Sequence, residues 1–218
     1  MTRTTRLAHT LAAGIFVLTA STVSAQRMDD KHMDGGSGRM NQAQMTRMMA
    51  SWPTASKEAA MFMTKKYGAP AAMTAEMAVW GKTGPWKRTV VYAREYAHEF
   101  PAHHTDVMQQ WIDYKAAPEM YDELAAYDGS VVLERTSGEM SARCDKEGAN
   151  FLALNLAHDI ATGKQTVEGA RKMYGEQITA LKARQPAPYT EKLMFGTMSN
   201  TADADRALGT ERMGSARP

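Results

Sequence analysis

Two runs of aromatic and β-branched residues, separated by a short turn, constrain the fold of this chain more than any other feature. The runs cover residues 77 to 80 and 86 to 96, and the segment between them contains Gly81, Gly84 and Pro85. Aromatic and β-branched residues favour strands, whereas glycine and proline favour turns. The pattern therefore predicts a β-hairpin.

Further elements are predicted on both sides of this hairpin from apolar spacing and from glycine and proline stops. In chain order they are a helix from residue 54 to 67, the hairpin, a strand from 107 to 114, a helix from 118 to 127, a strand from 130 to 136, a long helix from 139 to 162 and another from 166. Such runs of strands and helices indicate an α+β fold. We expect a small antiparallel sheet of about four strands packed against helices, in the order α-β-β-β-α-β-α-α.

The first 25 residues have the composition of a cleavable signal peptide. Arg3 and Arg6 give a positive start, an apolar run follows over residues 11 to 20, and small residues precede position 26. The apolar run has about half of the roughly 20 residues that a membrane-spanning helix needs. The sequence therefore predicts a periplasmic or secreted protein with no transmembrane segment after cleavage of the signal.

Charge and cysteine content exclude some classes of protein. The chain has 26 Lys and Arg and 24 Asp and Glu, and the predicted signal removes two arginines, so the remainder is balanced. A chain without excess positive charge has no field to attract phosphate, which argues against nucleic-acid binding. Cys144 is the only cysteine, so no internal disulfide is possible although export would permit one.

Composition divides the rest of the chain into three parts. Residues 26 to 50 are polar, small and rich in methionine, and they are predicted to form a flexible arm. Residues 51 to 185 contain the periodic patterns and form the single predicted α+β domain. Residues 186 to 218 begin with two prolines and contain few apolar residues, so a loose C-terminal tail is predicted.

Two segments resemble a family of exported bacterial proteins that has no assigned activity. They read GPWKRTVVYAREYAHEFPAHHTDVMQQWIDY and YDELAAYDGSVVLERTSGEMSARCDKEGANFLALNLAHDIATG. A weaker likeness links KKYGAPAAMTAEMAVWGKTGPWKRTVVY to envelope-assembly proteins of the SmpA/OmlA type, in which a helix, a Gly-Pro turn and a hairpin follow one another. Those proteins are lipoproteins, and this chain lacks the cysteine that would carry the lipid. The first resemblance implies export, and the second implies an envelope-protein partner.

Histidines and an aspartate gather where one predicted strand ends and the next begins. His98 ends the first strand, and His103, His104 and Asp106 start the second, so a turn around Pro101 would place them together at one end of the hairpin. Imidazole and carboxylate groups within reach of one another hold divalent metals or share a proton. His158 would complete a set of His98, His104, Asp106 and His158 if its helix packs over this end of the hairpin. The alternative is a solvated polar loop.

Cys144 is a weaker candidate for a catalytic thiol. The long helix predicted from residue 139 would place it near a helix start, where the dipole favours thiolate. His158 would lie about 21 Å along the same helix, so a partner base would have to come from the histidines between residues 98 and 104. The alternative is a buried cysteine that acts as a small core residue.

The methionine-rich arm offers a third kind of site. Thioethers are soft ligands that suit Cu(I), so an exported arm with six methionines and His32 could capture copper or silver ions. The alternative is that methionine is simply abundant in this chain. The six methionines of the arm are Met28, Met33, Met40, Met45, Met48 and Met49.

Three function classes follow from these candidates. The first is an exported binding or interaction module for a small ligand or an envelope protein, with a divalent transition metal at the histidine hairpin. The second is a soft-metal scavenger that uses the arm, and the third is a Cys-His hydrolase or transferase. The chain contains no phosphate-binding glycine loop, no His-Glu-x-x-His helix and no Gly-x-Ser-x-Gly elbow, so a non-enzymatic function is expected.

Overall fold

The computed structural model describes residues 42 to 202 and residue 205. By its contacts the chain divides into residues 1 to 36 and residues 37 to 218, and every described residue belongs to the second unit. The predicted signal peptide, residues 26 to 41 of the predicted arm and nearly all of the tail beyond residue 202 lie outside the described residues.

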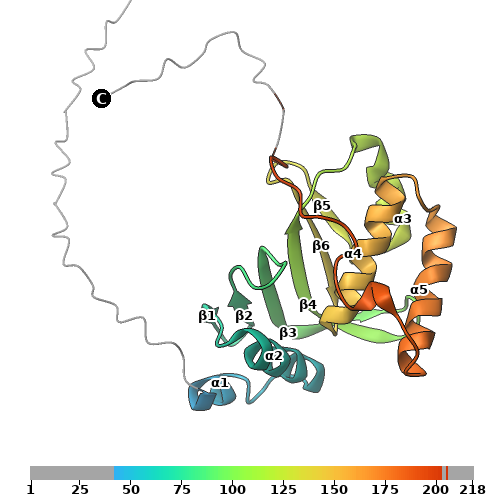
Figure 1. The fold of residues 1–218 in the computed structure, drawn as a ribbon. Coiled ribbons are helices and arrows are strands. Elements are labelled where there is room, and N and C mark those ends of the chain that lie inside the picture. The colour runs from blue at the N-terminus through green and yellow to red at the C-terminus, as the bar shows by residue number, and fades with distance from the viewer. Residues whose placement is uncertain (1–41, 203–204, 206–218) are drawn as a thin grey trace, which may run out of the picture. The chain divides into compact units, whose positions relative to one another are not determined.

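A six-stranded antiparallel sheet forms the centre of the fold (Figure 1). The strand order is β1-β2-β3-β4-β6-β5, so the chain runs as a meander from β1 to β4 before β5 and β6 add the other edge. A register shift interrupts the pairing of β3 and β4 between Val91 and Tyr96. The strands are β1 Ala72–Met73, β2 Met77–Trp80, β3 Arg88–His98, β4 His104–Asp113, β5 Val132–Glu134 and β6 Glu139–Cys144.

Helices from both halves of the chain cover one face of this sheet. Gln110 of β4 contacts Met63 of α2 and accepts a hydrogen bond from the Asn150 amide of α4, so α2 and α4 lie on the same face. α5 packs against α4 and α3. The helices are α1 Gln42–Met48, α2 Thr54–Tyr67, α3 Tyr121–Tyr127, α4 Glu147–Ala161 and α5 Val167–Lys182, with single 3₁₀ turns at Pro118–Met120 and Pro188–Thr190.

The predicted α+β class is confirmed, but the expected strand count and order are wrong. The hairpin of β2 and β3, the strand near residue 107 and the helices near residues 54, 121 and 167 are present. The long helix predicted from residue 139 is instead strand β6, a break and then α4. β6 has the sequence EMSARC, which lacks β-branched residues and favours a helix. Pairing with β4 on one side and β5 on the other overrides that preference.

The described part of the expected arm is helical. Met45 of α1 and Met49 just after it are buried in the cluster that α2 forms with β2, β3 and β4. These two thioethers therefore act as core residues. Met48 is half-buried, and the other three methionines of the arm lie outside the described residues.

The start of the expected C-terminal tail packs on the domain. Gly138 has a φ of 63°, and a Cβ at this position would lie 2.1 Å from the Thr201 carbonyl oxygen. Only glycine permits this approach, so the turn before β6 and the segment around Thr201 fit closely. Among the described residues, no helix combines the length and the apolar character needed to cross a membrane.

Candidate metal centre

The end of the β3–β4 hairpin brings two histidines and one aspartate together. His98, the last residue of β3, pairs with His104, the first residue of β4, and Tyr96 pairs with Asp106. In an antiparallel pair, directly opposed residues project their side chains to the same side of the sheet. The strand register therefore places His98, His104 and Asp106 in one cluster.

The ligand atoms of these three side chains converge on the Asp106 carboxylate. His98 Nδ1 lies 3.3 Å from Asp106 Oδ2, and His104 Nε2 lies 3.2 Å from Asp106 Oδ1. One ligand atom from each residue can be chosen so that all three lie within 4.8 Å of one another. Asp106 is 2% exposed, and both imidazoles are about four-fifths buried.

Three of these buried atoms have no hydrogen-bond partner. They are His98 Nδ1, His104 Nε2 and Asp106 Oδ1, whose mutual contacts lack the alignment of hydrogen bonds. Buried polar atoms without partners are costly, and a native fold that retains several in one place usually binds something there. The unpartnered atoms therefore make this cluster a candidate binding site.

The outward nitrogens of both rings face acceptors. His104 Nδ1 lies 2.8 Å from the Ala102 carbonyl oxygen, and because a carbonyl only accepts, Nδ1 carries the proton. His98 Nε2 faces Asp128 Oδ1 at 3.7 Å. Metal-binding histidines have this arrangement, in which the second N–H points to a carbonyl or carboxylate and the first nitrogen presents its lone pair.

Charged groups of both signs surround the cluster. Asp106 and Asp128 are buried carboxylates, and Arg143 has its Nε 4.0 Å from Asp106 Oδ2. Arg171 lies on the Phe100 ring and donates to the Tyr127 carbonyl, next to Asp128. Asp106, followed by Cys144, raises the pKa of His104 to about 11, so His104 is protonated in the metal-free protein and would release this proton on binding a metal.

The same geometry suits a divalent transition metal. Zn²⁺ binds histidine nitrogen and carboxylate oxygen at about 2.0 to 2.2 Å, which places neighbouring tetrahedral ligands about 3.4 Å apart. The closest separations in the cluster are 3.2 and 3.3 Å. A small rearrangement of the side chains is thus sufficient to surround one ion.

His158 does not join this cluster. Its Nδ1 contacts the Tyr114 hydroxyl at 3.0 Å, and its ring stacks on Phe195. Tyr114 follows the last residue of β4, whereas His104 is the first, so roughly 30 Å of strand separates the two histidines. The reason is the direction of α4, which begins beside the cluster at Glu147 and carries His158 away from it. The structure therefore unites three of the four predicted ligands.

Cys144 is the last residue of strand β6. The prediction that it lies near the start of a helix is wrong. Cys144 pairs with Met108 across the β4–β6 ladder, and its side chain interacts with His104. The thiol donates a hydrogen bond of 3.5 Å to Asp145 Oδ1. Burial raises the pKa of Cys144, so the group is a thiol at neutral pH.

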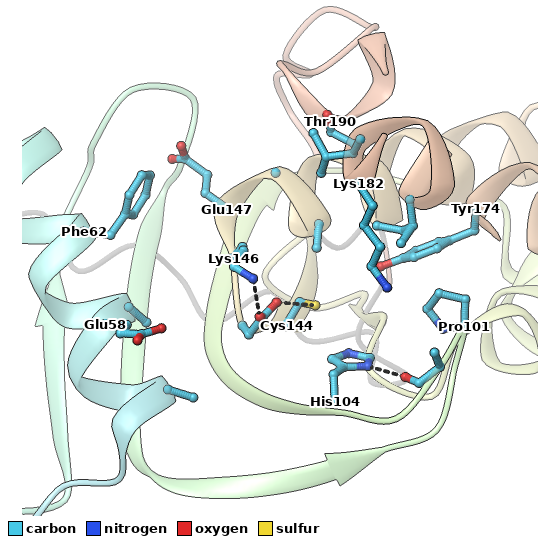
Figure 2. Close-up of a pocket in the computed structure, with 18 of the residues that line it drawn as sticks. Glu58, Phe62, Pro101, His104, Cys144, Lys146, Glu147, Tyr174, Lys182 and Thr190 are labelled. Carbon is cyan, nitrogen blue, oxygen red and sulfur yellow. Dashed lines mark hydrogen bonds and ion pairs between the residues drawn. The ribbon is translucent and has the colours of Figure 1, made fainter. Parts of the chain in front are cut away.

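A cleft of about 660 Å³ opens next to the cluster, with His104 and Cys144 in its wall (Figure 2). This volume lies within the range of small-molecule sites. Lys182 extends from α5 into the cleft on the side of His104. The other lining residues come from five segments, namely α2 (Ala55, Glu58, Ala59, Phe62), the hairpin turn (Pro101, Ala102, His103), residues 145 to 149 around the start of α4, α5 (Tyr174, Ile178, Leu181) and the 3₁₀ turn that ends at Thr190.

Another buried carboxylate, Glu147, is the first residue of α4 and lies three residues after Cys144. Its Oε1 accepts hydrogen bonds from the Tyr67 hydroxyl at 2.6 Å and from Trp86 Nε1 at 2.7 Å, and its Oε2 is paired with the Lys66 ammonium. Burial and the Glu147 carboxylate raise the pKa of Tyr67. The carboxylate thus joins α2, the β2–β3 hairpin and α4. No sequence pattern predicts this role of Glu147.

Comparison with known proteins gives no match to a family model, to a curated protein or to a solved structure. The resemblance to exported bacterial proteins therefore stays a prediction from sequence.

Proposed function

We propose that this protein is an exported binding module that holds a divalent transition metal between His98, His104 and Asp106. The observation that carries the proposal is the convergence of three buried, unpartnered ligand atoms on one point. A satisfied hydrogen-bond network would need no further group, whereas two imidazole nitrogens and one carboxylate oxygen of this cluster lack well-aligned hydrogen bonds. Export rests on the composition of residues 1 to 25.

The adjoining cleft supports a role in binding a small ligand near the metal. Only His104 of the three proposed ligands lines the cleft, so the ion would lie behind its wall. The lining is largely apolar with a few charged groups, which is typical of small-molecule sites. The ligand would reach the metal centre past His104 and Cys144.

Metal binding can be tested with purified protein freed of metal by a chelator. Addition of zinc should raise the melting temperature of the wild type, since an ion that binds only the folded state stabilises it. The substitutions His98→Ala, His104→Ala and Asp106→Asn should each abolish this increase. If zinc, nickel and copper all leave the wild-type melting curve unchanged, the proposal is wrong.

His103→Ala is the matched control for these variants. His103 lies in the same turn as His104, but its side chain is largely exposed and pairs with Glu99. Its loss should leave the zinc-dependent increase intact. If His103→Ala loses the zinc-dependent rise in melting temperature as fully as His98→Ala does, metal binds the exposed turn and not the buried cluster.

One observation favours a second candidate, a thiol-dependent hydrolase or transferase, because Cys144 interacts with His104 in the cleft wall. Two features count against it. Nδ1 of His104 is held by the Ala102 carbonyl and its Nε2 faces Asp106, so the ring does not bridge a thiol and a carboxylate through different nitrogens. The thiol pKa is also raised, whereas nucleophilic cysteines have lowered values. Rapid labelling of native Cys144 at neutral pH would support this candidate.

A further inference from the structure

We propose that Cys144 is the fourth ligand of the metal centre, so that a His₂-Asp-Cys set binds a borderline or soft ion such as Zn²⁺ in preference to Mg²⁺ or Ca²⁺. This inference rests on the proposed function, because it concerns the same ion. It changes the chemistry of the site, since sulfur excludes hard cations that prefer oxygen ligands.

The sheet places Cys144 beside the three-residue cluster. β6 pairs with β4, and Cys144 lies opposite Met108, two residues from Asp106. Asp106 and Cys144 therefore lie near each other on adjacent strands, and His104 is two residues before Asp106. Cys144 and His104 also line the same wall of the cleft (Figure 2).

The thiol is free to exchange its present partner for a metal. Its hydrogen bond to Asp145 Oδ1 is 3.5 Å long, and thiols are weak donors. In its place a metal–sulfur bond would form, with release of the thiol proton to solvent, because a coordinating thiol is deprotonated. Burial explains why the group remains protonated without metal.

A separate observation points to a cation at this place without reference to the thiol. Asp106 is 2% exposed, and its Oδ1 has no hydrogen-bond partner. This carboxylate oxygen faces His104 Nε2, which is itself unpartnered. Zn²⁺ is bound by nitrogen, oxygen and sulfur donors of this kind. Cys144 Sγ is not one of the atoms that lie within 4.8 Å of one another, so the thiol would have to turn towards the three-residue cluster to bind the ion.

Co²⁺ provides the test, because it occupies zinc sites and its bonds to thiolate give a sulfur-to-metal charge-transfer absorption. The full chain contains one cysteine, so any such absorption must come from Cys144. Metal-free protein titrated with Co²⁺ should develop this band in proportion to bound metal. Zinc should abolish it, and a large excess of Mg²⁺ or Ca²⁺ should not.

Cys144→Ser should bind Co²⁺ without the band and at least about tenfold more weakly. His103→Ala, the control, should keep both the band and the affinity. Wild-type protein that binds Co²⁺ without a charge-transfer band overturns the fourth-ligand inference and leaves the three-residue site in place. Wild-type protein that binds no Co²⁺ overturns both. The wild-type spectrum decides the question even if the serine variant does not fold.

Discussion

Two buried carboxylates lie on either side of the β6–α4 junction, and their surroundings differ. Glu147 receives the Tyr67 hydroxyl and the Trp86 N–H and is paired with Lys66. Asp106 is as deeply buried, yet its Oδ1 faces an imidazole nitrogen without a hydrogen bond. Burial alone therefore does not distinguish a structural carboxylate from a binding one. The completeness of the hydrogen bonding does.

This difference predicts two separable responses. Loss of Glu147 should weaken the fold, because three elements meet at its side chain. Loss of the Asp106 cluster should mainly change what the protein binds.

Glu147→Gln should lower the free energy of unfolding by about 3 kcal/mol, since the buried Tyr67 and Trp86 donors lose their hydrogen bonds to a charged group. The amide has one acceptor oxygen, so its NH₂ group would face either these donors or the half-exposed Lys66 ammonium. Urea denaturation measures the change. Glu58→Gln, in the same cleft but exposed, is the control and should change the value by less than about 0.5 kcal/mol. Equal effects in the two variants would remove the structural role assigned to Glu147.

Zinc at about 100 times its dissociation constant should raise the free energy of unfolding by about 2.7 kcal/mol in the wild type. Glu147→Gln should show the same increase from its lower starting value, because its site is intact. Asp106→Asn should show none. Urea denaturation with zinc and with chelator measures both quantities. If Glu147→Gln loses the zinc increment, the two carboxylates belong to one coupled unit.

Tyr67→Phe removes one of the donors to Glu147 and should cost about 1.5 kcal/mol, the lower end of the range for a hydrogen bond to a charged group. The measurement is again urea denaturation. Tyr121→Phe is a suitable control, because Tyr121 is also half-buried but no hydrogen bond of its hydroxyl is found in the described part of the chain. If Tyr67→Phe lowers the free energy of unfolding no more than the control does, the Tyr67 hydrogen bond does not stabilise the Glu147 carboxylate.

His104 also predicts a pH dependence of stability, because its imidazole is mostly buried against the Asp106 carboxylate. Its pKa is about 11 in the folded, metal-free protein and about 6.5 when unfolded. Because the folded state holds the proton more tightly, this stabilisation is complete below pH 6.5 and is lost as the pH rises towards 11. The stability deficit of His104→Gln relative to the wild type should therefore shrink from pH 6 to pH 9. A deficit that grows over this range would contradict the assignment.

The sequence was most informative where the structure is local. His98, His104 and Asp106 lie on one hairpin, so strand periodicity and a turn at Pro101 were enough to predict their convergence. The position of His158 depends on the direction of α4 relative to the sheet, which no local pattern encodes. β6 was missed for a similar reason, since its helix-favouring residues become a strand only through pairing with β4 and β5. The position of Cys144 next to the β4 strand depends on that same pairing.

The short distance along the chain between the proposed ligands has a consequence for the order of folding. Residues 98 to 106 span only nine positions, and closing such a short loop costs little chain entropy. The three-residue set can form with the β3–β4 hairpin itself, before α4 and α5 dock. Cys144 arrives later, when β6 adds to β4. Under the proposed function, the unfolded chain would therefore bind its ion at the hairpin first and close the site around it afterwards.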